Sequence, residues 1–138
     1  MVSADLIINT DGGARGNPGL AASAFVVRDA KNVKLYSESE SIGYSTNNIA
    51  EHTAVLLAMK WLQQKYLGPA KLVEFRIDSE LVVNQLTGRY KIKSPGLATI
   101  IKQTKELEVN SKYTLNFIHI PREENHEADA LVNIELDK

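Results

Sequence analysis

The sequence predicts an α/β domain in which a five-stranded mixed sheet is flanked by helices, and three observations support this. Segments with strand periodicity alternate with segments of helical periodicity along the chain. The second and third strand-like segments are joined by Asp29-Ala30-Lys31-Asn32, which is typical of a hairpin turn. Helical segments precede the fourth and fifth strand-like segments, and helical crossovers join parallel strands. We therefore expect three antiparallel strands first, then two strands parallel to the first.

The first three strands are expected over residues 5–11, 21–28 and 33–43. The first contains the apolar run Leu6-Ile7-Ile8 and ends in the carboxylate of Asp11. A glycine-rich loop with the sequence Asp-Gly-Gly-Ala-Arg-Gly-Asn-Pro-Gly follows, from residue 11 to 19. Glycine allows positive φ angles and the close approach of a ligand. A carboxylate at this position is well placed to hold a hard cation near a phosphate.

A long helix is expected to begin at the capping residues Thr46-Asn47-Asn48 and to run to Tyr66, before Gly68-Pro69. Its apolar face consists of residues that recur at helical spacing, namely Ala50, Ala54, Leu57, Ala58, Trp61 and Leu62. The rest of the chain is expected to form a strand over residues 72–78, a short helix over 79–86, a helix over 95–108, a strand over 113–120 and a helix over 124–136.

The composition is that of one soluble globular domain covering residues 1–138, and we expect a monomer. Hydrophobic residues make up 43% and charged residues 24%, but no apolar stretch is long enough to span a membrane. The N-terminus lacks the basic and apolar segments of a secretory signal. The absence of cysteine excludes disulfides and thiolate zinc sites, and it fits a reducing cytoplasm. With a net charge of -1, a nucleic acid would need a local basic patch or metal ions for binding.

Four carboxylates fall where the expected fold can bring them together. Asp11 and Asp78 end two parallel strands, whose carboxyl ends open on the ligand side of the sheet. Glu51 is expected in the first turn of the long helix and Asp129 in the first turns of the last helix. Taken singly, each acid is more simply explained as a helix cap or as a charge favoured by the helix dipole.

Taken together, these four carboxylates would repel one another unless a cation lay between them. Carboxylate oxygens suit Mg²⁺ or Mn²⁺, and Mg²⁺ also accepts phosphate oxygens as ligands. Two such ions about 4 Å apart can orient an attacking water and stabilise the leaving oxygen of a phosphodiester. The set therefore predicts a metal-dependent site for phosphodiester cleavage.

Four motifs resemble those of the type 1 ribonuclease H family, in the same order and over nearly the whole chain. They are Thr10-Asp11-Gly12-Gly13-Ala14 with Gly16-Asn17-Pro18-Gly19, Thr46-Asn47-Asn48-Ile49-Ala50-Glu51, Asp78-Ser79-Glu80, and Asn125-His126-Glu127-Ala128-Asp129-Ala130-Leu131. The resemblance implies a ribonuclease H-like fold and a single ribonuclease H domain. It also implies two Mg²⁺ ions, with Mn²⁺ as an expected substitute, and hydrolysis of the RNA strand of RNA–DNA hybrids to 5′-phosphate and 3′-hydroxyl ends. On that basis the catalytic metal ligands are Asp11, Glu51, Asp78 and Asp129.

The resemblance also implies substrate contacts. Asn17 and the run Thr46, Asn47, Asn48 match positions that meet phosphates, sugars and minor-groove edges, where 2′-hydroxyls distinguish RNA from DNA. The same run can cap the long helix, and both roles can hold at once. Gly12, Gly13 and Gly16 are expected to let the substrate backbone approach, although they could simply form a tight hairpin.

The loop before the last helix departs from the family pattern. Many relatives carry a histidine there, whereas this chain has Pro121-Arg122-Glu123-Glu124-Asn125. Arg122 cannot shuttle protons near neutral pH, but it could pair with Asp129 or with a phosphate and so join the catalytic residues. It could equally be an ordinary surface residue. The three histidines show no spacing that suggests a metal site.

The segment after the short helix is a second departure, because it is much shorter than the basic protrusion of some relatives. Arg89, Lys91 and Lys93 alternate with Tyr90 and Ile92, so three cations could contact phosphates, or the segment could simply be solvated. Binding through these cations alone would be weak and sensitive to salt. Glu80 adds a negative charge where many relatives have an amide.

Three functional hypotheses follow. The first is a metal-dependent endoribonuclease acting on RNA–DNA hybrids, with double-stranded RNA as a second candidate substrate. The second is a non-catalytic nucleic-acid-binding module, which the presence of all four acids disfavours because a binder gains nothing from carboxylates facing phosphates. The third is another nuclease or a transposase-like enzyme on the same fold. The glycine-rich loop and the Thr46-Asn47-Asn48 run favour the ribonuclease.

Overall fold

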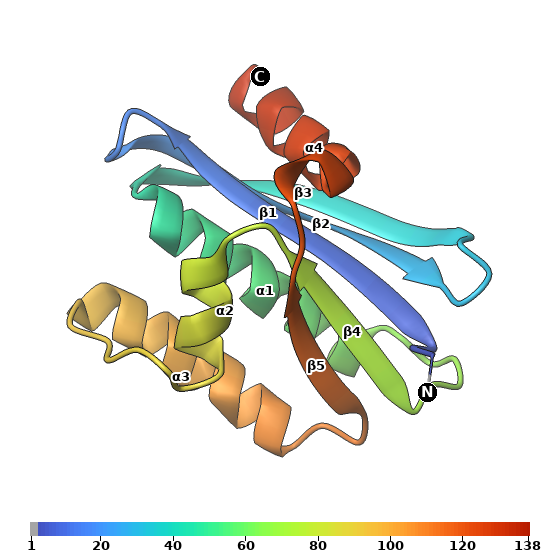
Figure 1. The fold of residues 1–138 in the computed structure, drawn as a ribbon. Coiled ribbons are helices and arrows are strands. Elements are labelled where there is room, and N and C mark those ends of the chain that lie inside the picture. The colour runs from blue at the N-terminus through green and yellow to red at the C-terminus, as the bar shows by residue number, and fades with distance from the viewer. Residues whose placement is uncertain (1–2) are drawn as a thin grey trace.

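The computed structural model describes residues 3–138 as a five-stranded mixed sheet with helices on both faces (Figure 1). The strand order is β3-β2-β1-β4-β5. β2 is antiparallel to both β1 and β3, whereas β4 is parallel to both β1 and β5. The strands are β1 (Leu6–Arg15), β2 (Gly19–Asp29), β3 (Lys34–Ser45), β4 (Leu72–Ile77) and β5 (Thr114–His119). The predicted fold class and strand directions are confirmed.

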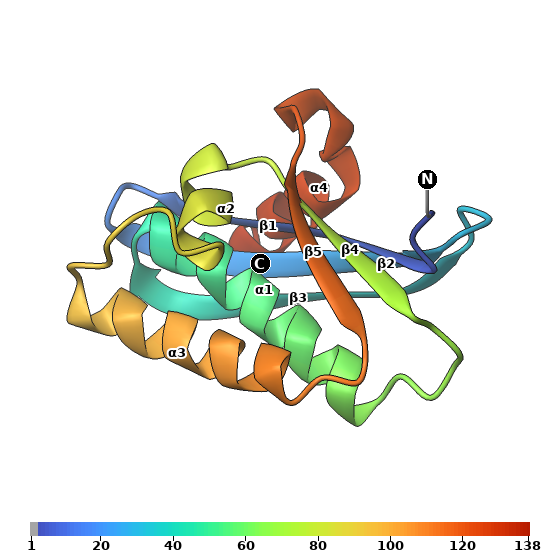
Figure 2. The same cartoon turned by 60° about the horizontal axis from the view of Figure 1, so that its bottom comes forward.

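The helices lie on the two faces of this sheet. They are α1 (Asn47–Gln64), α2 (Glu80–Leu86), α3 (Pro95–Val109) and α4 (His126–Leu136). The side chains of Thr46, Ser79 and Ser94 cap the first three helices, as expected from residues that accept hydrogen bonds from free N–H groups. Figure 2 shows α1 and α3 below the sheet and α4 above it. None of the helices in residues 3–138 is both long and apolar enough to cross a membrane.

Two apolar clusters fix these layers. The larger cluster packs α1 against the sheet through side chains such as Ile8, Phe25 and Phe75. The smaller one packs Val132 of α4 against Ala22 and Ala24 of β2. Because side chains alternate along a strand, neighbouring positions of β1 face different layers. Asp11, which pairs with Ala24, therefore belongs to the face covered by α4.

The glycine-rich segment differs from the loop predicted over residues 11–19. Residues 11–15 continue β1 and pair with β2 as far as Arg15 and Leu20, so only residues 16–18 form the turn. The pairing of β1 with β4, however, ends at Thr10 and Ile77. Asp11 therefore pairs with a residue of β2, but it lies one residue beyond the last residue of β1 that pairs with β4.

The last helix also begins later than predicted. Residues Arg122–Glu124 form a short 3₁₀ turn, and α4 starts at His126. Asn125 separates the two with φ -119° and ψ 31°, which is not helical geometry. Every other helix and strand end lies within two residues of its expected position, apart from the extension of β1.

Candidate active site

Asp11 and Asp78 meet where β1 and β4 separate. Thr10 and Ile77 form the last pair of the parallel ladder, and each acid is the next residue along the chain. Asp11 is 8% exposed, and Asp78 is partly buried. The divergence of the strands leaves room between them for a third side chain, which comes from α1.

That third side chain is Glu51, which α1 carries to the two strands because its backbone passes very close to β1. A Cβ atom on Gly12 would overlap the backbone of Ala50 and Glu51, so this approach requires glycine. The buried hydroxyl of Ser23 donates a hydrogen bond to the carbonyl of Ala50 (2.6 Å) and holds the same turn of α1 against β2. Glu51 lies beyond the first turn of α1, which contains no acidic residue, and the prediction of a first-turn position is wrong.

The carboxylates of Asp11, Glu51 and Asp78 form one cluster. One oxygen from each lies within 4.8 Å of the other two. Burial raises the pKa of Asp11 to about 8, and the neighbouring charge of Asp78 adds to the rise. Burial also raises the pKa of Glu51 to about 7, again with a contribution from Asp78, while Ser79 and Arg122 oppose it.

Such shifts arise because burial disfavours the charged form of a carboxyl group, and because a neighbouring carboxylate without a counter-charge disfavours it further. The ion pairs found within residues 3–138 include none of these three acids. A hard divalent cation would supply the missing positive charge, and Mg²⁺ favours an all-oxygen donor set of this kind. The cluster therefore fits a metal ion on chemical grounds.

Asp129 and Arg122 lie at the rim of this cluster. Both line a cavity of about 260 Å³ together with Asp11, Glu51 and Asn47. Asp129 is exposed on α4 and is not part of the 4.8 Å group, although its charge contributes to the raised pKa of Asp11. Arg122, exposed on the 3₁₀ turn, is close enough to lower the pKa of Glu51. The structure thus brings three of the four predicted acids together and places the fourth across the same cavity.

Three of the predicted substrate contacts belong to the turns beside this cavity. Asn47 Oδ1 accepts a hydrogen bond from the backbone N–H of Ala14 (2.7 Å), and Asn17 Oδ1 accepts one from the backbone N–H of Asn47 (3.0 Å). These bonds tie the β1–β2 hairpin to the start of α1. Asn17 and Asn47 are exposed, and Thr46 caps α1.

Asn48 is directed differently, toward α2. Its Nδ2 donates to Gln85 Oε1 (3.3 Å), and its Oδ1 is buried with no partner among the described residues. Gln85 Oε1 also lies 2.8 Å from Nε2 of the fully buried His52, whose pKa is lowered by burial. In this arrangement the Nδ2 group of Asn48 is engaged by Gln85.

The two adjacent glycines of β1 occupy unlike positions. Gly12 is buried against α1, so the close approach that it permits is to the helix backbone. A Cβ on Gly13 would meet only Val132 Cγ1 of α4, at 3.7 Å. Gly16 has φ of 92° and forms the hairpin turn.

The basic segment between α2 and α3 has no helix or strand. Arg89, Lys91 and Lys93 are exposed, and the ion pairs of residues 3–138 include none of them. The segment leads into α3, whose Gly96 lies near Ile49 at the start of α1. The three cations therefore lie shortly before the contact between α3 and the first turn of α1, which follows Thr46.

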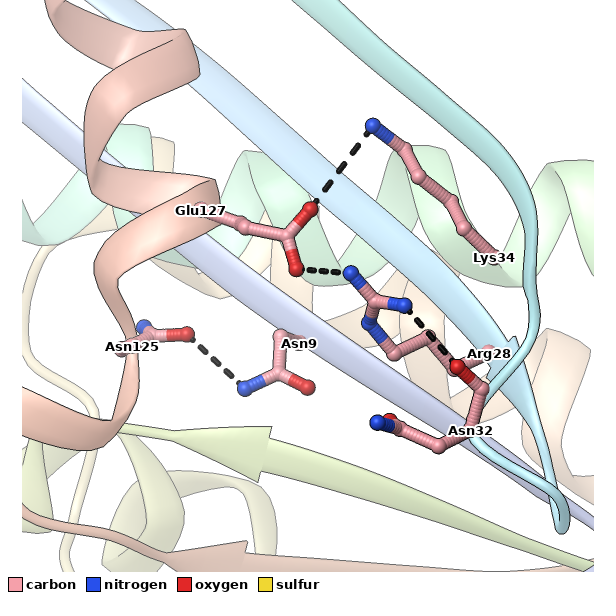
Figure 3. Close-up of polar contacts among 6 residues, drawn as sticks. All are labelled: Asn9, Arg28, Asn32, Lys34, Asn125 and Glu127. Atoms are coloured by element: carbon pink, nitrogen blue, oxygen red, sulfur yellow. Dashed lines mark hydrogen bonds and ion pairs between the residues drawn. The ribbon is translucent and has the colours of Figure 1, made fainter.

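Asn125 is a residue of this site that the sequence pattern did not identify. It is 1% exposed, and its Nδ2 donates to Asp78 Oδ2 (3.1 Å) and to the carbonyl of Thr10 (2.9 Å). Its Oδ1 accepts a hydrogen bond from Asn9 Nδ2 (3.0 Å), as Figure 3 shows. Its place before a helix suggests an N-cap, yet its side chain caps nothing. The only sequence feature that could have indicated this buried contact was the polar residue Asn9 next to the apolar run of β1.

Known proteins are similar to this chain in sequence and in fold. A family model described as reverse transcriptase-like matches residues 9–134. The crystal structure of RNase H1 from the halophilic archaeon Halobacterium salinarum is 33% identical, with a TM-score of 0.87 over 96% of this chain and 97% of that one. The chain belongs to the type 1 ribonuclease H family. Another ribonuclease H of this family, LC11-RNase H1 in complex with an RNA/DNA hybrid, is 42% identical, with a TM-score of 0.87 over 96% of both chains.

Some relatives in the ribonuclease H family are much longer than this chain. A bifunctional protein of Mycobacterium tuberculosis is 35% identical over 133 residues, which are 96% of this chain but 35% of that protein. The chain thus spans about a third of the length of this relative. Its N-terminal RNase H domain, solved as a fusion protein, has a TM-score of 0.87 to this structure with 34% identity.

Proposed function

We propose that this chain is a metal-dependent endoribonuclease that hydrolyses the RNA strand of RNA–DNA hybrids and leaves 5′-phosphate and 3′-hydroxyl ends. The observation that carries the proposal is the cluster of the buried Asp11 with the partly buried Glu51 and Asp78. One oxygen of each lies within 4.8 Å of the other two, and the ion pairs of residues 3–138 do not balance their charge. The likeness to LC11-RNase H1, which has been solved with an RNA/DNA hybrid, supports the choice of substrate. We further propose that residues 1–138 act as one ribonuclease H domain.

In this proposal Asp11, Glu51 and Asp78 hold the metal ions, and Asp129 completes the set from α4. Two Mg²⁺ ions, or Mn²⁺ in their place, would activate water and stabilise the leaving 3′-oxygen when bound. The buried position of Asp11 keeps the ligand oxygens away from bulk water, and Gly12 lets Glu51 reach them from the helix side. No protein nucleophile is required.

The substrate would lie across the 260 Å³ cavity and the turns beside it. Asn17, Asn47 and Thr46 offer amide and hydroxyl groups for phosphates and 2′-hydroxyls. Gly13 leaves the strand surface free of side chain next to the cavity, whereas Asn48 would act by holding α1 against α2. Arg89, Lys91 and Lys93 would contact phosphates farther along the hybrid.

Arg122 is proposed as a phosphate contact at the cavity rim. It is exposed, lines the cavity and lowers the pKa of Glu51 through its charge. The ion pairs found within residues 3–138 do not include one between Arg122 and Asp129. A guanidinium can bind two phosphate oxygens at once. Because it stays protonated, it would neutralise charge rather than transfer protons.

The test is cleavage of end-labelled RNA–DNA, RNA–RNA and DNA–DNA duplexes in Mg²⁺, in Mn²⁺ and in EDTA. We expect cutting of the RNA in the hybrid with either metal and none in EDTA, with products that carry 5′-phosphates. Strong cutting of DNA–DNA would favour another nuclease on this fold, and binding without cutting would favour a non-catalytic module. Cutting of RNA–RNA would add double-stranded RNA as a substrate.

The matched variant is Asp78→Asn, which keeps the size of the side chain and removes its charge. We expect hybrid binding and circular dichroism to stay close to wild type, with cleavage reduced by at least about 100-fold, as is usual when an essential electrostatic group is removed. Wild-type cleavage by Asp78→Asn in Mg²⁺ would contradict the proposed metal site.

A further inference from the structure

Asn125 joins three parts of the site through one buried side chain. Its Nδ2 contacts the Thr10 carbonyl, where the pairing of β1 with β4 ends, and the Asp78 carboxylate directly after β4. Its backbone carbonyl accepts the N–H of Asp129 in the first turn of α4 (3.1 Å). The ladder between β1 and β4 ends at Thr10 and Ile77, so backbone hydrogen bonds no longer hold the two strands together at this point. Asn125 spans that gap.

The direction of the Asn125 amide is set by Asn9. The two ends of an amide have nearly the same shape but opposite hydrogen-bonding character. Asn9 Nδ2 donates to Asn125 Oδ1 at 3.0 Å, which turns Asn125 Nδ2 toward Thr10 and Asp78 (Figure 3). A reversed amide would place its oxygen against a carbonyl and a carboxylate, and would leave buried acceptors without a donor.

We propose that Asn125 is a positioning residue, oriented by Asn9, which holds the Asp78 carboxylate at a fixed place relative to Asp11 and to the start of α4. The inference rests on the proposed function, in which Asp78 and Asp129 are metal ligands. A second-layer hydrogen bond of this kind orients a ligating carboxylate and raises metal affinity. In this role Asn9 and Asn125 act through Asp78 rather than as metal ligands.

A neighbouring cluster provides the control. Glu127, two residues into α4, pairs with Arg28 and Lys34 on β2 and β3, and Figure 3 shows this cluster beside the amide pair. Glu127 has no hydrogen bond to Asp78 among the contacts of residues 3–138. Glu127→Gln therefore perturbs the anchoring of the same helix without touching the amide pair, and an exposed ion pair of this type adds little to stability.

The first experiment uses metal-free protein and does not depend on activity. In EDTA, the Asn125 side-chain amide protons should exchange slowly with solvent by NMR in the wild type and in Glu127→Gln, and quickly in Asn9→Asp. Asp at position 9 can only accept, so it cannot donate to Asn125 Oδ1. Fast exchange in the wild type, or slow exchange in Asn9→Asp, would overturn the assignment of Asn9 as the orienting residue.

The second experiment measures hybrid cleavage against Mg²⁺ concentration, at a temperature where every variant is folded by circular dichroism. For Asn125→Ala and Asn9→Asp we expect kcat to fall at least tenfold and the Mg²⁺ midpoint to rise at least fivefold, with KM for the hybrid within twofold of wild type. Glu127→Gln should match the wild type within twofold. Should Asn125→Ala fail to fold, Asn9→Asp and the smaller change Asn9→Ala carry the same test.

Two outcomes separate this inference from the proposed function. If the wild type cuts the hybrid but Asn9→Asp and Asn125→Ala keep its kcat and Mg²⁺ midpoint, the positioning role is wrong and the proposed function stands. If the wild type cuts no hybrid, the proposed function fails. The positioning role is then tested by the rise in Tm that Mg²⁺ causes. An equal rise in the wild type and in Asn9→Asp overturns the positioning role, and a rise that is lost in Asn9→Asp supports it.

Discussion

Replacing Asp11 with asparagine should stabilise the metal-free protein, by an amount that grows with pH. Burial, with help from Asp78, raises the pKa of Asp11 in the folded state from 3.8 to about 8. A group whose pKa is raised on folding contributes stability that is complete below its unfolded value and is lost as pH rises through its folded value. The wild type should therefore lose stability between about pH 4 and pH 8, whereas the Asp11→Asn variant has no charge to bury at this position.

The size of the effect follows from the shift. Each pKa unit corresponds to about 1.4 kcal/mol, and a rise from 3.8 to about 8 therefore costs the folded state about 4 kcal/mol at pH 7. Burial is the largest part of this cost, and the charges of Asp78, Asp129 and Glu51 add the repulsive part. Because the acids of the cluster titrate together, we expect one substitution to recover only part of the cost. We expect Asp11→Asn to be about 2 to 3 kcal/mol more stable than wild type at pH 8, and nearly equal to it at pH 4.

Urea unfolding in EDTA at several pH values from 4 to 9 measures this difference. The control is Glu40→Gln on β3, an exposed acid whose replacement should change stability equally little at every pH. Adding Mg²⁺ should stabilise the wild type much more than Asp11→Asn, because the cation replaces the missing counter-charge. If the difference in unfolding free energy between the wild type and Asp11→Asn does not change from pH 4 to pH 8, the reasoning that burial and neighbouring charges destabilise ionised Asp11 is refuted.

Three further predictions concern the surroundings of the cluster. Gly12→Ala should destabilise the protein by about 2 kcal/mol or more, because its Cβ overlaps α1. Gly13→Ala, which meets only Val132 Cγ1 at 3.7 Å, should change the urea midpoint little, and equal midpoints for both variants would contradict the packing argument. Replacing Arg89, Lys91 and Lys93 with alanine should weaken hybrid binding and reduce the slope of log K against log salt by about 2 to 3 if each cation meets one phosphate. Lys31 between β2 and β3, Lys65 directly after α1 and Lys71 directly before β4 are also exposed. Alanine at these three positions should leave that slope unchanged, and an equal loss in both triple variants would remove any special role for the first three. Arg122→Ala should lower kcat/KM for the hybrid about tenfold, as expected when one charge-assisted phosphate contact is lost, and Arg122→Lys should recover part of it. Wild-type kinetics in Arg122→Ala would make Arg122 an ordinary surface residue.

The sequence was sufficient to predict the sheet and its acids because their signals are local. Apolar periodicity marked the strands, Thr46 and Ser79 marked helix starts, and parallel strand ends placed Asp11 near Asp78. The extension of β1 to Arg15 was missed because glycines suggest a loop, whereas pairing with β2 is a long-range interaction that satisfies the same backbone groups. The sequence likewise could not explain why position 12 requires glycine, since the reason depends on where α1 packs against β1.

Asn125 and Asn48 show the same limit for side chains. Each stands at or next to a helix start, where the sequence suggests capping. In the structure, Asn125 turns its amide to Asp78 and Thr10, and Asn48 turns its amide to Gln85. These partners are at least 37 residues away along the chain, so only the folded arrangement of the elements could reveal them.

The contacts that hold the acidic cluster together are uncharged, and this has a functional consequence. Asn125 fixes Asp78 with an amide, Ser23 fixes the turn before Glu51 with a hydroxyl, and Gly12 admits α1 by having no side chain. Each sets the position of a carboxylate without supplying a full positive charge, so the repulsion within the cluster is left for a bound cation to relieve. A lysine at position 125 would place an ammonium beside Asp78 instead. We therefore expect Asn125→Lys to abolish Mg²⁺-dependent thermal stabilisation and cleavage together, because its ammonium would supply part of the positive charge that the neutral amide leaves to a bound cation and could not accept the hydrogen bond from Asn9. A gain in Tm with Mg²⁺ equal to that of the wild type would contradict this expectation.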